Sequence, residues 1–121
     1  MLIQDISFPT PAENILYDEA LLQLAEEGVG GEALRFWESD QLFIVLGRTG
    51  KVEEDIQVGA ALRDSIAVMR RSSGGGTVLQ GRGCLNYSLV LSKDADPAIN
   101  DLRKSYQFVL SKVIQALKSL G

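Results

Sequence analysis

Histidine is absent from this sequence, and cysteine occurs once, as Cys84. Without histidine, catalysis by a histidine acid or base, serine–histidine triads and the usual zinc sites are excluded. A single cysteine can form neither an internal disulfide nor a CxxC metal site, which fits a reducing compartment. These absences remove many classes of enzyme and metalloprotein.

Long apolar runs and a signal-peptide pattern are also missing. The longest apolar runs, such as residues 42–46 and 89–91, are far shorter than the roughly 18 residues that indicate a membrane span. No basic segment followed by an apolar one comes after Met1, so we expect no secretory signal and a cytoplasmic protein. The net charge of −4 opposes non-specific binding to nucleic acid, but it leaves a local group of arginines free to hold a small anion. The sequence therefore predicts neither a membrane nor a nucleic-acid partner.

The composition is that of a folded chain. Of the 121 residues, 45% are hydrophobic and 23% are charged, a balance that can bury a core. The length fits a single domain over residues 1–121, and no repeat, low-complexity segment or linker interrupts it. We expect one domain.

Thr10, Pro11 and Glu13 predict the start of the first helix. Threonine caps a helix, proline suits its first position, and a glutamate three residues after the cap completes a capping box. Residues four apart predict a core-facing stripe made of Leu16, Ala20 and Leu24 beside Tyr17, Leu21 and Ala25. Glycines from position 28 onward end the helix.

Alternation and turn residues predict the other elements. A first strand is expected in the mostly apolar residues 2–8, before the helix. Further strands are expected over 33–37 and 42–46, joined by a hairpin turn at 38–41, and over 66–69, 77–79 and 85–91. Helices are expected over 52–62 and after the starts at Asp96-Pro97 and Asn100-Asp101. The last helix carries a core-facing stripe of Tyr106, Leu110, Val113, Leu117 and Leu120. The order β-α-β-β-α-β-β-β-α predicts an α+β fold with a mixed, largely antiparallel sheet packed with helices.

The densest chemical signal lies between Arg70 and Ser88. Arg70 and Arg71 precede three consecutive glycines, and Asn86 and Ser88 share one face of the strand that follows. Glycine backbone approaches a ligand closely and offers N–H groups to an anion, while an arginine grips a carboxylate or phosphate with paired hydrogen bonds. The combination predicts a site for a small anionic molecule. The plain alternatives are a turn and solvated arginines, and no nucleotide-binding P-loop or G-x-G-x-x-G spacing occurs.

The lipoate–protein ligase family has a signature that two segments of this chain resemble, Arg70-Arg71-Ser72-Ser73-Gly74-Gly75-Gly76-Thr77-Val78 and Leu85-Asn86-Tyr87-Ser88. The flanks agree with the resemblance. They are Asn14-Ile15-Leu16-Tyr17-Asp18-Glu19-Ala20-Leu21-Leu22, Leu34-Arg35-Phe36-Trp37 and Val45-Leu46-Gly47-Arg48. The resemblance covers nearly the whole chain, in a superfamily that also contains octanoyltransferases and biotin–protein ligases.

The resemblance implies a ligase that activates lipoate with ATP and Mg²⁺ as lipoyl-adenylate and transfers the acyl group to a lysine of a lipoyl carrier domain. Such carriers belong to 2-oxoacid dehydrogenases or the glycine cleavage system. The implied substrate and adenylate contacts are Arg70, Arg71, Ser73, Gly74, Gly75, Gly76, Thr77, Asn86 and Ser88. No residue of the protein is expected to ligate a metal.

Two departures from the family pattern affect the expected chemistry. Gln80 stands where family members commonly have a histidine, and it cannot carry a proton near neutral pH. The family's lysine would follow the last helix, and no lysine of this chain replaces it by motif, so no catalytic residue is assigned. The chain is about half the length that the resemblance implies. We therefore expect a truncation or one half of a split enzyme, which self-associates or pairs with a missing C-terminal half.

Two other interpretations stay open. One is an octanoyl or lipoyl transferase that needs no ATP, in which Cys84 or a later cysteine would carry the acyl group. For Cys84 we favour a packed or incidental thiol, because only Arg82 lies near it in the sequence to lower the pKa of its thiol. The other is a non-catalytic module for binding or assembly. The sequence selects neither the acyl acid nor the carrier protein.

Overall fold

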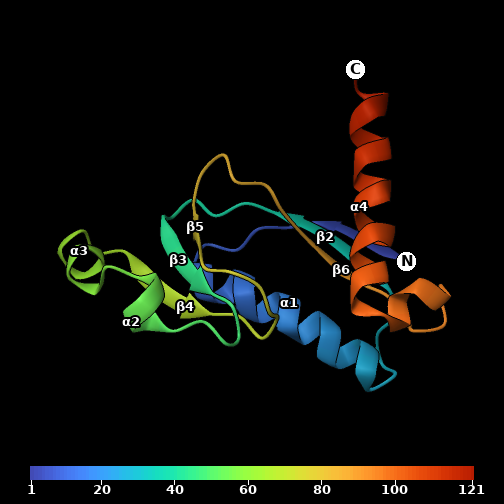
Figure 1. The fold of residues 1–121 in the computed structure, drawn as a ribbon, viewed down its shortest axis with the longest axis horizontal. Coiled ribbons are helices and arrows are strands. Elements are labelled where there is room, and N and C mark those ends of the chain that lie inside the picture. Colours follow the sequence, from blue (N-terminus) through green and yellow to red (C-terminus); the bar gives the residue numbers. More distant parts are fainter. The chain divides into compact units, whose positions relative to one another are not determined.

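A computed structural model describes residues 1–121, which form two compact units, Met1–Val90 and Leu91–Gly121. We describe each unit by itself. The first contains all the strands and three helices (Figure 1). Its elements are β1 (Leu2–Asp5), α1 (Pro11–Glu26), β2 (Ala33–Trp37), β3 (Phe43–Leu46), α2 (Val52–Asp55), α3 (Val58–Arg63), β4 (Ala67–Arg70), β5 (Val78–Gln80) and β6 (Asn86–Val90).

The strands form two mixed sheets, in the orders β1-β2-β6 and β4-β3-β5. In the first sheet β1 runs parallel and β6 antiparallel to β2, with Arg35 opposite Ser88 and Trp37 opposite Asn86. In the second, β4 runs parallel and β5 antiparallel to β3. The α+β class and the order of elements are confirmed. Parallel and antiparallel pairs are equally represented, so antiparallel pairing has a smaller share than expected.

The predicted hairpin between β2 and β3 is wrong. Both edges of β2 are occupied, by β1 and β6, and both edges of β3 by β4 and β5. Residues 38–42 therefore carry the chain from the first sheet to the second, and residues 81–85 carry it back from β5 to β6. The consecutive strands β2 and β3, and likewise β5 and β6, therefore belong to different sheets.

The start of α1 is confirmed, with a complete capping box. The Glu13 backbone N–H donates to the Thr10 hydroxyl (3.3 Å), and the Thr10 backbone N–H donates to the Glu13 carboxylate (3.0 Å). The predicted apolar stripe is right only along one edge. Tyr17, Leu21 and Ala25 are half-buried, whereas Leu16 is 61% exposed and Asn14 is fully buried. Helix α1 turns its polar Asn14 and Asp18 inward because both bind a buried arginine on β2.

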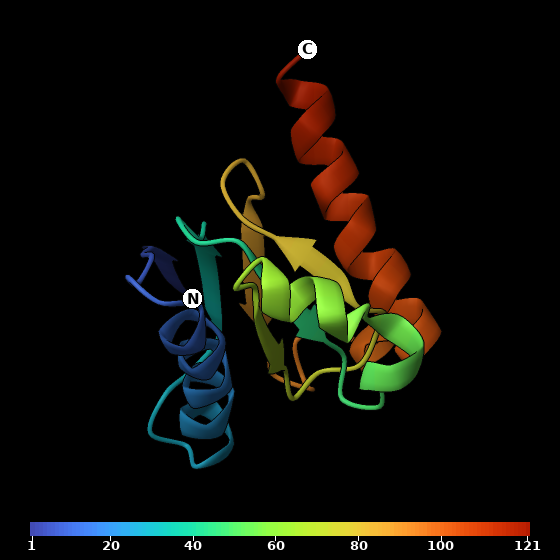
Figure 2. The same ribbon diagram turned by 90° about the vertical axis from the view of Figure 1, so that its left-hand side faces the viewer.

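The predicted helix over 52–62 is divided into α2 and α3. Ile56 has extended backbone angles (φ −129°, ψ 135°), which end the first helix. Three β-branched residues and one glycine occur in this stretch, and these residue types weaken a helix. The two short helices make the crossover from β3 to the parallel strand β4, in front of the strands in Figure 2.

The apolar core of the first unit is small. Its buried apolar side chains are Ala33, Trp37, Phe43, Val45, Leu46 and Ala61. Trp37, Phe43 and Val45 pack together in one cluster, with Ile15 of α1 against them. Ala33, Arg35 and Trp37 alternate along β2 and are all buried, so an arginine occupies an inward position between two apolar residues. The core therefore contains a charge that its neighbours must satisfy.

The second unit consists of a 3₁₀ helix, η1 (Pro97–Asn100), and α4 (Leu102–Ser119). Both predicted starts are confirmed, because the Asp96 carboxylate caps the Ala98 N–H and that of Asp101 caps the Lys104 N–H, each at 2.8 Å. The predicted core-facing stripe is exposed at Tyr106, Leu110, Leu117 and Leu120. Within its unit, α4 has only η1 and the preceding loop to pack against.

None of the helices in the chain combines the length and the apolar character that crossing a membrane requires.

Candidate functional site

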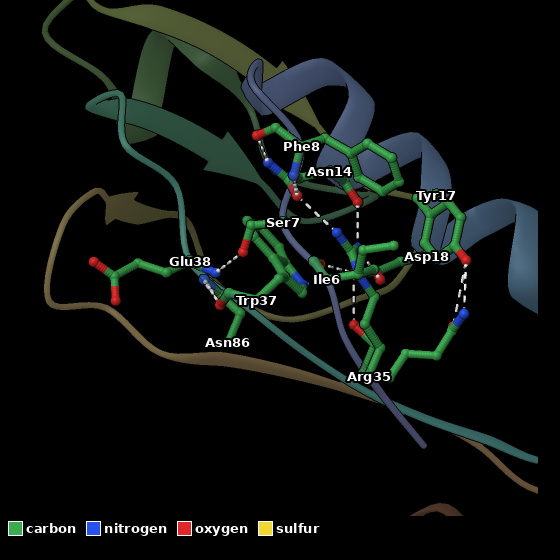
Figure 3. A network of polar contacts seen from close by, with 12 residues as sticks. Ile6, Ser7, Phe8, Asn14, Tyr17, Asp18, Arg35, Trp37, Glu38 and Asn86 are labelled. Carbon is green, nitrogen blue, oxygen red and sulfur yellow. Dashed lines mark hydrogen bonds and ion pairs between the residues drawn. The ribbon is translucent and has the colours of Figure 1, made fainter. Parts of the chain in front are cut away.

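Arg35 is the centre of a buried polar network (Figure 3). Its side chain is fully buried, and every nitrogen of the guanidinium group donates a hydrogen bond. Nε donates to the Ile6 carbonyl (3.0 Å), Nη1 to the Asn14 carbonyl (2.9 Å) and the Asp18 carboxylate (2.6 Å), and Nη2 to Asn14 Oδ1 (2.6 Å). A buried charge with a paired carboxylate and this many partners is satisfied by the protein itself.

Aromatic rings complete the surroundings of Arg35. The guanidinium carbon lies 5.4, 4.8 and 5.1 Å from the ring centroids of Phe8, Tyr17 and Trp37, within the range of cation–π attraction. Asn14 also fastens the chain before α1, donating from Nδ2 to the Phe8 carbonyl and accepting at Oδ1 from the Phe8 N–H. The network therefore joins β2, α1 and the segment after β1.

Asp18 extends this network toward the surface. Its Oδ1 pairs with Arg35, while Oδ2 accepts from Trp37 Nε1 (3.2 Å) and from the Ser88 hydroxyl (2.5 Å). The Asp18 side chain remains 26% exposed. Through Ser88 the network thus reaches strand β6 and a neighbouring cavity.

The cavity has a volume of about 420 Å³ and is lined entirely by residues of the first unit. Both sheets and α1 contribute to it. Its apolar lining comes from Ile15, Leu22, Trp37, Val45, Val78, Leu89 and Val90. Its polar lining comes from Asp18, Glu19, Arg71, Ser72, Ser73, Gln80, Asn86, Tyr87 and Ser88. The cavity is therefore amphiphilic, with Arg71 as its one cationic side chain.

The predicted site residues divide into two groups. Arg71, Ser73, Asn86 and Ser88 line the cavity together, although they come from distant parts of the sequence. The lining does not include Arg70, Gly74, Gly75, Gly76 and Thr77. Arg70 ends the strand before the loop that carries Arg71 and Ser73, and the other four belong to that loop.

Arg70 stabilises the turn after β3. Its Nη1 donates to the carbonyls of Gly47 (3.0 Å), Arg48 (3.1 Å) and Gly50 (2.7 Å). A guanidinium nitrogen that is shared among three backbone carbonyls holds the backbone rather than facing the cavity. The structure therefore gives the two adjacent arginines different surroundings.

Arg71 has spare hydrogen-bonding capacity. Its Nη2 donates to the carbonyls of Gly74 and Gly76, both at 2.9 Å, while Nε and Nη1 have no partner in the protein. The side chain is only partly buried, and it lines the cavity. The Nη2 nitrogen thus holds the glycine loop in its turn, and the edge with Nε and Nη1 is available to an anion.

Glycine serves two purposes here, a left-handed conformation within the loop and one close backbone contact to it. Gly75 has φ +101°, a left-handed conformation that side chains rarely adopt. A Cβ added to Gly47 would lie 2.0 Å from the Gly75 carbonyl oxygen, so the turn after β3 and the glycine loop are in direct contact. The Arg48 N–H donates to the Ser73 carbonyl (2.9 Å), and the Thr77 hydroxyl donates to Asp55 (2.7 Å).

Sequence analysis missed the polar residues behind the cavity, Asn14, Asp18 and Arg35. A signal for them exists in the sequence. Arg35 alternates with Ala33 and Trp37 along a strand, so its side chain points to the same inward face as theirs. Asn14 and Asp18 lie four residues apart, on one face of a helix. A buried arginine requires such partners.

Cys84 is exposed and does not line the cavity. No group of three or more acidic, cysteine or histidine side chains in the chain is arranged to hold a metal ion.

The first unit thus combines two mixed sheets and helices with an amphiphilic cavity whose lining includes one arginine. The sequence profile described as the lipoyl protein ligase A/B catalytic domain matches residues 10–121. The chain belongs to this family.

Curated relatives include two bacterial proteins named octanoyltransferase LipM. That of Brevibacillus brevis is 28% identical over 112 residues, which cover 93% of this chain and 40% of the relative. That of Carboxydothermus hydrogenoformans is 33% identical over 110 residues, covering 91% of this chain and 40% of the relative. The chain thus spans well under half the length of these relatives.

Solved structures of lipoate ligases have the same fold. A lipoate-protein ligase A bound with ATP is 26% identical with a TM-score of 0.85, covering 99% of this chain and 47% of that one. A bi-partite lipoate protein ligase of Thermoplasma acidophilum, described together with its E2 lipoyl domain, is 26% identical with a TM-score of 0.84. That similarity covers 99% of this chain and 45% of the neighbour.

Proposed function

We propose that this chain supplies the acyl-binding part of a catalytic domain that attaches a lipoyl or octanoyl group to a lysine of a lipoyl carrier domain. One observation carries the proposal: an amphiphilic cavity whose lining combines apolar side chains with a single cation, Arg71. Its volume of about 420 Å³ falls in the range of roughly 300–1,000 Å³ that is typical of small-molecule sites. A medium-length fatty acid has the matching chemistry, an apolar chain with one anionic end.

The bound acid is oriented by the polarity of the lining. Ile15, Leu22 and Val45 offer apolar surface to the hydrocarbon chain. The free edge of Arg71 offers Nε and Nη1 to the carboxylate, and such paired, charge-assisted hydrogen bonds are the strongest available to an arginine. In this arrangement the reacting carbonyl carbon lies beside the glycine loop.

The leading proposal for the reaction is activation by ATP. A carboxylate oxygen attacks the α-phosphorus of ATP and displaces pyrophosphate. The lysine amine then attacks the acyl carbon of the adenylate, AMP leaves, and a proton from the nitrogen passes to solvent. The lipoate-protein ligase A bound with ATP supports this route by its similarity over nearly the whole chain.

The glycine loop is the proposed contact for the adenylate, through Ser73, Gly74, Gly75, Gly76 and Thr77. Arg70 would support this loop by holding the adjacent turn. Because the chain has no cluster of metal ligands, we propose that Mg²⁺ is held mainly by the phosphates of the nucleotide and by water, as is usual for this ion.

The second candidate is an octanoyl or lipoyl transferase that uses a thioester in place of ATP. The curated relatives named octanoyltransferase LipM favour it. In that reaction the acyl–sulfur bond breaks, the amide bond forms, and the thiolate receives the proton of the amine. Cys84 has a weak claim as the acyl carrier, since it does not line the cavity.

Two assays of the purified chain separate these routes. The first is lipoate-dependent ATP–pyrophosphate exchange, with octanoate and biotin as competing acids. The second is transfer from an octanoyl thioester to a carrier domain in the absence of ATP. Exchange that requires lipoate supports the ligase, and transfer without ATP supports the transferase. If neither occurs while octanoate still binds, the chain is a binding or assembly module.

Arg71→Ala tests the acyl site in all three cases. Loss of charged hydrogen bonds should lower the affinity for octanoate by about tenfold to a hundredfold. Arg71→Lys keeps the charge but not the paired N–H donors, so an intermediate loss of octanoate affinity is expected. Calorimetric titration with octanoate measures both. An unchanged affinity in Arg71→Ala would contradict the proposed orientation of the acid.

We also propose that the chain works together with further polypeptide, as a self-associated species or with a second half. The apolar side chains exposed on α4 and the open outer strands of both three-stranded sheets support this. Light scattering at high concentration, alone and with a separately produced C-terminal half of a relative, measures it. A monomer in both samples would overturn it.

A further inference from the structure

Helix α4 has an apolar stripe that is left uncovered. Tyr106, Leu110, Ile114 and Leu117 recur at helical spacing, so their side chains lie on one face of the helix. Each of them is between 48% and 61% exposed. A helix with this pattern ordinarily buries its stripe against another element. In the single chain, the stripe therefore lacks a partner surface.

The charges of α4 are all of one sign. The helix has four cations and no acidic side chain, and the cations are Arg103, Lys104, Lys112 and Lys118. None of them takes part in an ion pair of the chain. Pairing α4 with a second α4 would bring like charges together, which is unfavourable. The stripe therefore requires a partner surface that is acidic.

The outer side of α1 provides an acidic surface. A groove of about 490 Å³ lies there, lined by Glu19, Leu22, Gln23, Glu26, Glu27 and Ser72. Leu22 is 45% exposed, and Glu19 and Glu26 lie one helical turn before and after it. None of the three glutamates takes part in an ion pair of the chain. The groove thus offers an exposed leucine between two unpaired carboxylates.

The two units have opposite net charges. Residues 1–90 contain seven cationic and thirteen acidic side chains, whereas residues 91–121 contain five and three. A cationic amphipathic helix is also typical of proteins that bind an anionic membrane surface. The acidic first unit would be repelled by such a membrane. The charges therefore favour an acidic protein surface as the partner of α4.

We infer that the apolar stripe of α4 docks in the acidic groove beside α1 of a second copy of this chain. This inference rests on the proposed function, which includes self-association, and it names the two surfaces. The stripe covers Leu22, and the cations of α4 pair with the glutamates of the groove. The groove shares Glu19, Leu22 and Ser72 with the lining of the acyl cavity, so the docked helix lies beside that cavity.

Charge reversal on each surface tests the contact. One variant carries Glu26→Lys and Glu27→Lys, and the other carries Arg103→Glu and Lys118→Glu, whose positions lie one helical turn from stripe residues. Alone, each variant sets like charges across the contact, so association should weaken by at least about tenfold. Sedimentation and light scattering over a range of concentrations measure this.

An equimolar mixture of the two variants is the decisive sample. In the mixture each cationic surface meets an acidic one again, so the two variants should associate about as tightly as the original chain. Misfolding cannot produce such a restoration. Salt should weaken the association of the original chain, because it screens exposed charges.

Lys104→Glu is the matched control on α4. Lys104 lies two residues before Tyr106, on the side of the helix away from the stripe, so association should change by no more than about twofold. Leu110→Ala tests the apolar part of the contact and should weaken association by about tenfold. Circular dichroism reports whether each variant retains its helices.

Four outcomes overturn the inference: a monomer at every concentration, association that neither reversal weakens, a mixture that associates no better than its components, or a monomer that binds phosphatidylglycerol vesicles through Arg103 and Lys118. The last would assign α4 to a membrane surface. Octanoate titration of the same samples reports on the acyl site separately, because none of the substituted side chains lines the cavity. Failure of the original chain to bind octanoate counts against the acyl site, whereas failure of the mixture alone counts against this contact.

Discussion

Arg35 and Arg71 are two arginines of the same unit with opposite surroundings. Arg35 is fully buried, is paired with Asp18 and uses all of its nitrogens within the protein. Arg71 is partly buried, has no carboxylate partner and uses one nitrogen, to bind two carbonyls of its own loop. The contrast teaches that an arginine at a cavity with unused guanidinium nitrogens is available to a ligand, whereas a fully satisfied one stabilises the fold.

The two arginines are nevertheless connected. Arg35 holds Asp18, and Asp18 holds the Ser88 hydroxyl at the cavity. The scaffold therefore determines how β6 presents its polar side chains, while the glycine loop determines how Arg71 presents its charge. Substitutions on the two sides should separate stability from binding.

Arg35→Ala should cause the largest effect, because it leaves Asp18 as a partly buried charge without its partner. Breaking such a buried pair costs about 3–5 kcal/mol of unfolding free energy. Urea unfolding followed by Trp37 fluorescence measures the loss, since Trp37 is the only tryptophan and donates to Asp18. Octanoate binding should fall as well, because the cavity wall loses its support.

Arg63→Ala is the matched control for this substitution. Its ion pair with Asp64 is highly exposed, with 72% and 59% of the two side chains accessible. Surface changes of this kind usually alter stability by less than about 0.5 kcal/mol. If Arg35→Ala were as mild as this control, the network would not be what holds α1 to β2.

Gly47→Ala should have the next largest effect, and it tests whether shape positions the glycine loop. The added methyl would lie 2.0 Å from the Gly75 carbonyl oxygen, so the loop must move. Overpacking of this kind costs about 1–3 kcal/mol. Urea unfolding and octanoate titration are both expected to show a loss.

Gly59→Ala is the matched control. It makes the same glycine-to-alanine change but should raise the unfolding free energy instead of lowering it. Gly59 lies within α3, and a Cβ there would meet nothing within 4 Å. Alanine in a helix interior is favoured over glycine by about 0.5–1 kcal/mol. A stabilised Gly59→Ala beside a destabilised Gly47→Ala would confirm that close backbone contact, rather than glycine content, matters in the loop. Equal effects would refute this.

The sequence predicted local features well and long-range ones poorly. The capping box at Thr10, the caps at Asp96 and Asp101 and the order of strands and helices depend on neighbours in the chain, and all were predicted correctly. The rotation of α1 was not, because it depends on Arg35, 21 residues beyond Asn14. The division into two sheets depends on which distant strands pair with β2 and with β3. The turn residues between β2 and β3 carry no information about that pairing.

The candidate site shows the same division. The sequence marked Arg71, Ser73, Asn86 and Ser88, which the fold places around one cavity. It did not separate Arg71 from Arg70, because adjacent arginines look alike until the carbonyls around each are known. The roles of these residues toward a ligand stay predictions.

Thr10→Ala should lower the unfolding free energy by less than Arg35→Ala or Gly47→Ala. It removes the hydroxyl that accepts from the Glu13 N–H, and loss of such a cap costs about 1 kcal/mol. Because the cap is exposed and neither Thr10 nor Glu13 lines the cavity, octanoate affinity should not change. Urea unfolding with parallel octanoate titration checks both statements. Weakened binding would mean that the start of α1 influences the cavity.

Arg71→Ala should have the smallest effect on stability and yet a large effect on binding. Its hydrogen bonds to the Gly74 and Gly76 carbonyls are exposed, and water can replace them, so the unfolding free energy should fall by less than about 1 kcal/mol. No carboxylate depends on this arginine, in contrast to Arg35. Urea unfolding of Arg71→Ala beside Arg35→Ala measures the difference directly. If Arg71→Ala proved as destabilising as Arg35→Ala, the glycine loop would be part of the scaffold, and the free edge of Arg71 would no longer distinguish a ligand site from a structural one.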